Sequence, residues 1–139
     1  MKQKEIKTTA NISKSAINEQ RQNVDKKYIM KVEQKGHTVI LIDTQGDLDS
    51  FRLKLTNEYK TFQKSNIIVD IRMYKTLPVK DIESFLPLAK IHKKAKKSFV
   101  IVTSEPDFNA VSDKLAVVRS LQEAHDIIEM EEIERDLGF

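Results

Sequence analysis

Two short apolar blocks separated by a helical segment constrain the fold of this chain more than any other feature. The first is NIIVDI at residues 66–71 and the second is SFVIVT at residues 98–103. Both are rich in β-branched residues and apolar without alternation, which is typical of strands covered on both faces. The sheet that contains them is therefore expected to carry helices on either side.

Between the two blocks, apolar residues recur at intervals of three and four, the spacing that gathers them on one face of a helix. These residues are Val79, Ile82, Phe85, Leu86, Ala89 and Ile91. A strand, a helix and a second strand in this order form a right-handed βαβ unit and begin a parallel sheet. Pro87 removes one backbone hydrogen bond from the helix, so we expect a kink or a boundary near residues 83–86.

The segment before this unit predicts an antiparallel hairpin and a helix. Residues 28–33 and 38–43 flank a turn at residues 35–37, and two apolar runs so close together favour hairpin pairing. Asp47 or Asp49 can cap the helix that follows, because a carboxylate accepts a bond from a free first-turn N–H. The apolar stripe of this helix comprises Phe51, Leu53, Leu55, Tyr59 and Phe62.

The segment after the unit predicts a turn, one helical turn at residues 108–115 and a short edge strand at residues 116–118. Ser120 and Glu123 then have the spacing of a capping box at the start of a last helix, and Gly138 ends it. Its buried face is expected to comprise Leu121, Ala124, Ile127, Ile128 and Ile133. The fold class is therefore α/β, with a mixed, mostly parallel sheet packed by helices in the order β-β-α-β-α-β-(α)-β-α.

Length and composition favour one soluble domain. The chain has 139 residues and no Cys, which leaves room for one core and is compatible with a reducing compartment. No apolar run approaches the ~20 residues that span a bilayer, and the N-terminus is polar rather than a signal sequence. We therefore expect a cytoplasmic protein that does not bind a membrane.

Charge is distributed unevenly along the chain. Residues 1–27 carry seven basic against three acidic side chains, and residues 120–139 carry seven acidic side chains against one Arg. The first segment is predicted to be a flexible basic tail, with at best a frayed helix at residues 13–21, and residues 28–139 to form the domain. A uniformly basic nucleic-acid footprint is not what this distribution gives.

Residues 29–128 resemble the STAS domain, the fold of anti-sigma-factor antagonists and of the regulatory domain of sulfate transporters. The resemblance rests on IIVD at residues 67–70, on LAKIHK followed by FVIV at residues 88–93 and 99–102, and on VRSLQEA at residues 118–124. This last segment is similar to the closing element of the family, a strand followed by Ser-Leu-x-Glu-Ala. The resemblance implies a protein that binds a protein partner, such as an anti-sigma factor or another regulator.

The chain departs from the family at the turn before the second helix. STAS domains usually have Asp-Ser-Ser-Gly there, with one hydroxyl phosphorylated by the partner kinase. Val79 and Lys80 stand where the serines would lie, and Thr76 is the nearest hydroxyl. Because a phosphate acts as a switch by adding about two negative charges at a contact surface, the usual phospho-switch is not expected.

The C-terminal segment, residues 129–139, resembles the ending of short Bacteroidetes-type STAS-like proteins that are sometimes labelled ribonuclease Z. Ribonuclease Z binds two metal ions through a His-x-His-x-Asp-His cluster, and this sequence contains no such cluster. The residues therefore do not support a nuclease activity.

Neither a metal nor a cofactor site is predicted. The three histidines, His37, His92 and His125, are dispersed over a turn, a basic helical face and the last helix, whereas metal ligands are usually clustered. Asp70 ends a covered strand, where open α/β sheets place active sites. No base or nucleophile can be assigned beside it, so we interpret Asp70 as a turn-capping residue.

Two charged segments allow more than one interpretation. Lys90, Lys93, Lys94, Lys96 and Lys97 form a basic run. These cations could contact phosphates, but they also suit a helix C-terminus, and no aromatic residue is interleaved to stack a base. The acidic last helix could be solvated surface or a docking element. Its apolar residues Met130, Ile133, Leu137 and Phe139 could cover the sheet edge or bind a partner helix.

The sequence therefore predicts a non-catalytic, protein-binding STAS-like module. The expected contact residues lie in the turn and the first part of the second helix: Thr76, Leu77, Val79, Lys80, Asp81, Glu83 and Ser84. The alternatives are an enzyme subunit linked to RNA processing and an adaptor that binds RNA through the tail and the lysine run.

Overall fold

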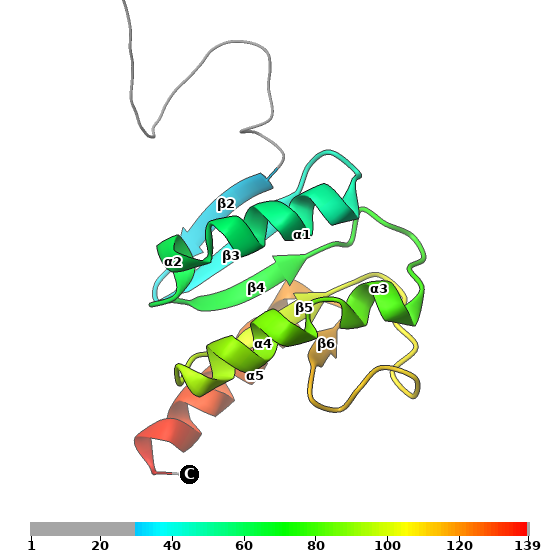
Figure 1. Ribbon diagram of the computed structural model, residues 1–139. Helices are drawn as coiled ribbons and strands as arrows, with labels where there is room; N and C mark the ends of the chain where they lie inside the picture. The colour runs from blue at the N-terminus through cyan, green and yellow to red at the C-terminus, as the bar shows by residue number, and fades with distance from the viewer. Residues whose placement is uncertain (1–29, 139) are drawn as a thin grey trace, which may run out of the picture.

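The computed structural model describes residues 30–138, which form one five-stranded sheet with helices on both faces (Figure 1). The predictions for the basic tail at residues 1–27, for the strand start at residues 28–29 and for Phe139 lie outside the described residues.

The sheet is mixed and mostly parallel, which confirms the predicted fold class. The strand order is β2-β3-β4-β5-β6. β2 pairs antiparallel with β3, and every later neighbouring pair is parallel. The strands are β2 (Met30–Lys35), β3 (Thr38–Asp43), β4 (Asn66–Asp70), β5 (Phe99–Val102) and β6 (Ala116–Val118). This architecture is compatible with an STAS-like fold.

Four helices pack on one face of the sheet. They are α1 (Leu48–Asn57), α2 (Tyr59–Phe62), α3 (Val79–Glu83) and α4 (Leu86–Lys94). The side chains beneath them form the larger core, which includes Phe51, Leu55, Val69, Phe85 and Ile101. Burial of side chains of this size, at roughly 1.5–3 kcal/mol each, is the main force that holds these helices on the sheet.

One long helix, α5 (Leu121–Asp136), covers the opposite face (Figure 1). Ala124 and Ile128 pack against Ile40, Ile68 and Val100 in a second core. The β-branched blocks of the sequence are thus covered on both faces, as their lack of alternation predicts.

Most predicted helix boundaries are confirmed. Asp47 is the N-cap of α1 and accepts a hydrogen bond from the Ser50 N–H at 3.2 Å. The second helix is interrupted between α3 and α4, and Pro87 lies in the first turn of α4, where its missing N–H is harmless. At the start of α5, Ser120 accepts from the Glu123 N–H at 3.1 Å.

Residues 108–110 make one turn, in which the Ala110 and Val111 N–H groups donate to the Asp107 carbonyl, and no regular helix forms there. Other sequence predictions are wrong. Leu53, Ile91 and Ile133, which we assigned to buried stripes, are more than half exposed. Leu53 follows the buried Phe51 by two residues and Ile133 follows the buried Ile128 by five, steps of about 200° and about 140° around a helix, so both point away from the sheet. Ile91 lies beside the buried face of α4 but outside it.

Candidate partner-binding surface

The carboxyl ends of β3 and β4 each carry a buried aspartate, Asp43 and Asp70. Open α/β proteins usually place their sites at the carboxyl ends of the parallel strands, which we call the carboxyl edge. The hydrogen-bond partners of these two carboxylates therefore show whether they are available to a substrate or hold the loops that follow the strands.

Asp70 holds the start of the loop that leaves β4. Its carboxylate accepts from the Arg72 backbone N–H at 3.1 Å and from Nε and Nη2 of the Arg72 guanidinium at 3.0 and 2.8 Å. The hydrogen bond and charge of Asp70 raise the pKa of Arg72 further above its ordinary value, against the effect of burial. Asp70 is therefore a turn-capping residue, as predicted from sequence, with an ion pair that sequence spacing did not reveal.

Asp43 plays the same part for the loop that leaves β3. It accepts from the backbone N–H groups of Gln45 and Gly46 at 3.0 and 3.3 Å and from the Tyr74 hydroxyl. Burial, together with this hydrogen bond, raises the pKa of Tyr74 well above its ordinary value. Tyr74 therefore stays protonated and donates, and the contact joins the loop after β4 to the end of β3.

The predicted contact residues divide into exposed and half-buried groups. Thr76 and Lys80 are exposed, and Leu77 and Val79 are half-buried. Leu77 packs against the larger core, so it anchors the loop rather than standing free. The exposed part of the predicted surface is thus narrower than the sequence alone indicated.

Three other predicted residues hold the surface in place. The Ser84 hydroxyl donates to the Asp81 carbonyl at 2.5 Å and accepts from Arg52 Nη1 at 3.0 Å. Glu83 accepts from the Ser112 backbone N–H at 2.6 Å. These contacts fasten α3 to α1 and to the loop between β5 and β6, so Glu83 and Ser84 position the surface.

Sequence reasoning missed two exposed hydrophobic side chains in the loops that follow β4 and β5. Met73 is 51% exposed, in the loop after β4, and Phe108 is 47% exposed, in the loop after β5. The Arg119 guanidinium lies over the Phe108 ring at 5.1 Å from its centroid, a cation–π contact. Neither residue belongs to a periodic stripe, so the sequence held no signal for its exposure.

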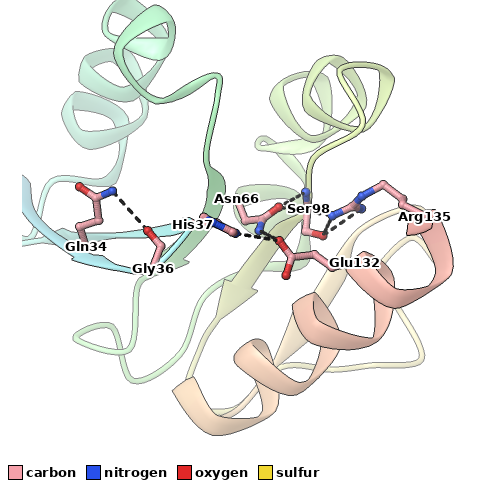
Figure 2. Close-up of polar contacts among 7 residues, drawn as sticks. All are labelled: Gln34, Gly36, His37, Asn66, Ser98, Glu132 and Arg135. Atoms are coloured by element: carbon pink, nitrogen blue, oxygen red, sulfur yellow. Dashed lines mark hydrogen bonds and ion pairs between the residues drawn. The ribbon is translucent and has the colours of Figure 1, made fainter. Parts of the chain in front are cut away.

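The amino ends of the parallel strands, which we call the amino edge, are covered by α5 (Figure 2). Asn66 is buried; its Oδ1 accepts from the Ser98 backbone N–H at 3.0 Å and its Nδ2 donates to Glu132 at 2.8 Å. The Ser98 hydroxyl donates to Glu131 at 2.6 Å and accepts from Arg135 at 3.3 Å. These polar contacts fasten the acidic helix to the sheet. The apolar residues Met130, Ile133 and Leu137 are more than half exposed, so they do not cover the sheet edge.

His92 is fully buried at the same edge, which corrects its placement on the solvent-exposed lysine face. Its Nε2 lies 2.7 Å from the Ser65 carbonyl and its Nδ1 lies 2.6 Å from the Tyr59 hydroxyl. A carbonyl can only accept, so Nε2 carries the proton and Nδ1 accepts from Tyr59. Burial lowers the pKa of His92 against the opposing effect of the hydrogen bond to Ser65, and the charges of Lys97 and Arg135 also lower it, so the ring is neutral.

Within residues 30–138 no three His, Cys, Asp or Glu side chains gather in a way that could hold a metal ion. His37 is exposed in the hairpin turn, His92 is buried and His125 lies on α5, so the structure does not bring the histidines together. None of the described helices has both the length and the apolar character that a bilayer span requires.

The fold and this edge define the class of protein: an α/β domain with a mixed sheet whose strand-end carboxylates are bonded to its own loops. No protein-family model matches the sequence, and a search of curated proteins gives no significant match. The case for a function is therefore made from the residues themselves.

Proposed function

We propose that this chain is a non-catalytic, STAS-like regulatory module that acts by occupying a protein partner in the cytoplasm. The fold class, with an antiparallel first hairpin followed by a parallel sheet, is compatible with this proposal. The segments that resemble the family, at residues 67–70 and 118–124, coincide with β4 and with the passage from β6 into α5. The partner is a protein of the anti-sigma-factor type or another regulator.

The observation that carries the proposal is the contrast between the polar and apolar groups at the carboxyl edge. Asp43 and Asp70 are bonded to the loops that follow them, so neither carboxylate is left to bind or activate a substrate. Met73 is nevertheless half exposed in the loop after β4, which also holds the exposed Thr76 and leads to the exposed Lys80 of α3. An exposed apolar side chain among charges on an ordered support suits protein recognition.

The start of α3 also supports a module without the family's phospho-switch. Pro78 is the N-cap and Val79 the first helical residue, so no hydroxyl stands at the helix N-terminus. Lys80 adds positive charge beside it. The partner is therefore expected to present an acidic and apolar surface, and binding is regulated by the amount of each protein.

The experiment compares two double variants as bait in pull-downs from the native host. Met73→Asp with Lys80→Glu changes the proposed surface. Ile91→Asp with Lys93→Glu is the matched control, because it replaces an exposed apolar residue and a lysine on α4 with the same two acids. We expect the first pair to lose the protein partner of the wild type and the control to keep it.

Binding of the same partners by both variants contradicts the proposed surface. Metal-dependent RNA cleavage by the pure protein contradicts the non-catalytic function. RNA binding that weakens steeply with salt and is lost on removing residues 1–27 instead favours the RNA adaptor, because phosphate contacts release counterions.

A further inference from the structure

The outer edge of β2 is the feature of the described residues that neither the core nor the proposed surface uses. β2 is the terminal strand of the sheet, and its residues after Met30 are exposed. Val32 is 47% exposed. A strand at a sheet edge presents unpaired N–H and C=O groups that can pair with another strand.

The register of the hairpin shows which backbone groups face outward. A turn at Gly36 and His37 joins Lys35 to Thr38, the closing pair. In such a hairpin the closing pair is hydrogen-bonded, and hydrogen-bonded pairs then alternate with non-hydrogen-bonded ones. Val32 opposes Leu41, a non-hydrogen-bonded position, so the N–H and C=O of Val32 point toward the open edge.

The same register separates the side chains of β2 between the two faces. Lys31 and Glu33 oppose Ile42 and Ile40, whereas Val32 opposes Leu41, and directly opposed residues share a face. Lys31 and Glu33 therefore lie on one face, where they form an ion pair at 3.1 Å. Val32 lies between them on the other face.

We infer that β2 pairs antiparallel with β2 of a second copy of this chain, with Val32 opposite Val32 of the second copy. In this register each Lys31 faces Glu33 of the other copy, and the two Val32 side chains meet on the opposite face. A register centred on Glu33 would instead oppose two glutamates and set Lys31 against Lys35. Like charges directly opposite one another are destabilising, so the charge pattern favours the Val32 register over the Glu33 register.

The consequence is a two-fold dimer in which the two sheets join into one continuous sheet. The proposed protein-binding residues lie at the carboxyl edge and on α3, away from β2 (Figure 1). Each copy in the dimer therefore keeps its own partner surface, and the inference stands whether or not the proposed function is correct.

Cysteine substitution tests the register directly, because the natural sequence has no Cys. Opposed residues of an antiparallel pair lie within the range that a disulfide bridges. The full-length Val32→Cys variant is expected to give a covalent dimer on mild oxidation. Leu53→Cys, at an exposed position on α1, is the matched control and is expected to remain monomeric on a denaturing gel.

Sedimentation velocity of the full chain over a concentration series provides the second test. Lys31→Glu is expected to raise the dimer dissociation constant about tenfold, because two attractive cross-strand pairs become repulsive. Combining Lys31→Glu with Glu33→Lys is expected to return the dimer dissociation constant to within about threefold of the wild-type value, because the same pairs form with reversed charges. Both sites are exposed, and circular dichroism confirms that each variant is folded.

A wild-type protein that is monomeric at every concentration overturns the inference; this is also the result expected if another segment occupies the edge. A dimer whose dissociation constant is unchanged by Lys31→Glu, or one in which Val32→Cys and Leu53→Cys crosslink equally, overturns it as well.

Discussion

The buried polar groups at the carboxyl edge and at the amino edge of the parallel strands have hydrogen-bond partners at different distances along the chain. At the carboxyl edge, Asp70 is bonded to Arg72, two residues further along the chain. At the amino edge, Asn66 and Ser98 are bonded to α5, 66 and 33 residues away. The carboxyl edge thus orders its own loops, whereas the amino edge joins the two ends of the fold.

This difference has an energetic consequence. The amino-edge groups lie beneath α5, where a lost partner leaves a donor or acceptor without water. Arg72 is 41% exposed at its side chain, so water can replace a partner that it loses. Equal deletions should therefore cost more stability at the amino edge than at the carboxyl edge.

Asn66→Ala should have the largest effect. It removes the acceptor of the Ser98 N–H and the donor to Glu132, and we expect the free energy of unfolding to fall by about 3 kcal/mol. Urea denaturation followed by circular dichroism measures the change. A loss smaller than that of Asp70→Ala would contradict the comparison between the two edges.

Acidification should also weaken the amino edge. Burial holds the pKa of His92 below its ordinary value of 6.5, so below that pH the unfolded state binds more protons than the folded state. The contribution of His92 to the free energy of unfolding is therefore fully present above about pH 6.5. It declines as the pH falls toward the lower pKa that His92 has in the folded state.

The measurement is the free energy of unfolding as a function of pH for the wild type and two variants. His92→Gln should flatten the decline because the buried ring is gone. His125→Gln, which removes a half-buried histidine whose pKa is also lowered by burial, is the comparison and should keep most of the decline. If the decline disappears only in His125→Gln, the loss of stability at low pH comes from His125 on α5 and not from His92.

Asp70→Ala should cost less than Asn66→Ala, about 1 kcal/mol. The variant loses the ion pair with Arg72, but partly exposed pairs contribute little and the guanidinium is hydrated after the change. Hydrogen exchange should show faster exchange in the loop after β4 and no change in α5. Faster exchange in α5 would mean that the two edges are coupled.

Ser104→Ala should have the smallest effect. Its hydroxyl donates to the Arg72 carbonyl at 3.0 Å in an exposed position, where water can take its place. We expect a change within about 0.5 kcal/mol of the wild type. A larger loss in thermal or urea unfolding would show that the carboxyl-edge loops depend on this contact more than their exposure implies.

Sequence patterns predicted the local features of the fold because local physics sets them. The β-branched blocks predicted strands covered on both faces, the turn at Gly36 predicted the hairpin, and Pro87 predicted the break before α4. Gly36 has a φ of +58°, a conformation that a residue without Cβ adopts most easily. Spacing and turn chemistry were sufficient for each of these.

The candidate surface was predicted only in outline. The sequence and its family resemblance indicated residues 76–84, but the structure divides them into exposed residues such as Lys80 and residues that hold the surface, such as Ser84. That division depends on Arg52 and Ser112, which are distant in sequence. No local pattern identifies such partners.

The sequence by itself determined the element types, the covered sheet and the scattered placement of the histidines along the chain. Only the tertiary structure decided that His92 is buried, that Asn66 and Ser98 fasten α5, and that Val32 turns its backbone toward an open edge. Periodicity depends on neighbours three or four residues away, whereas these three features depend on strand order and register, which bring together residues far apart in the chain.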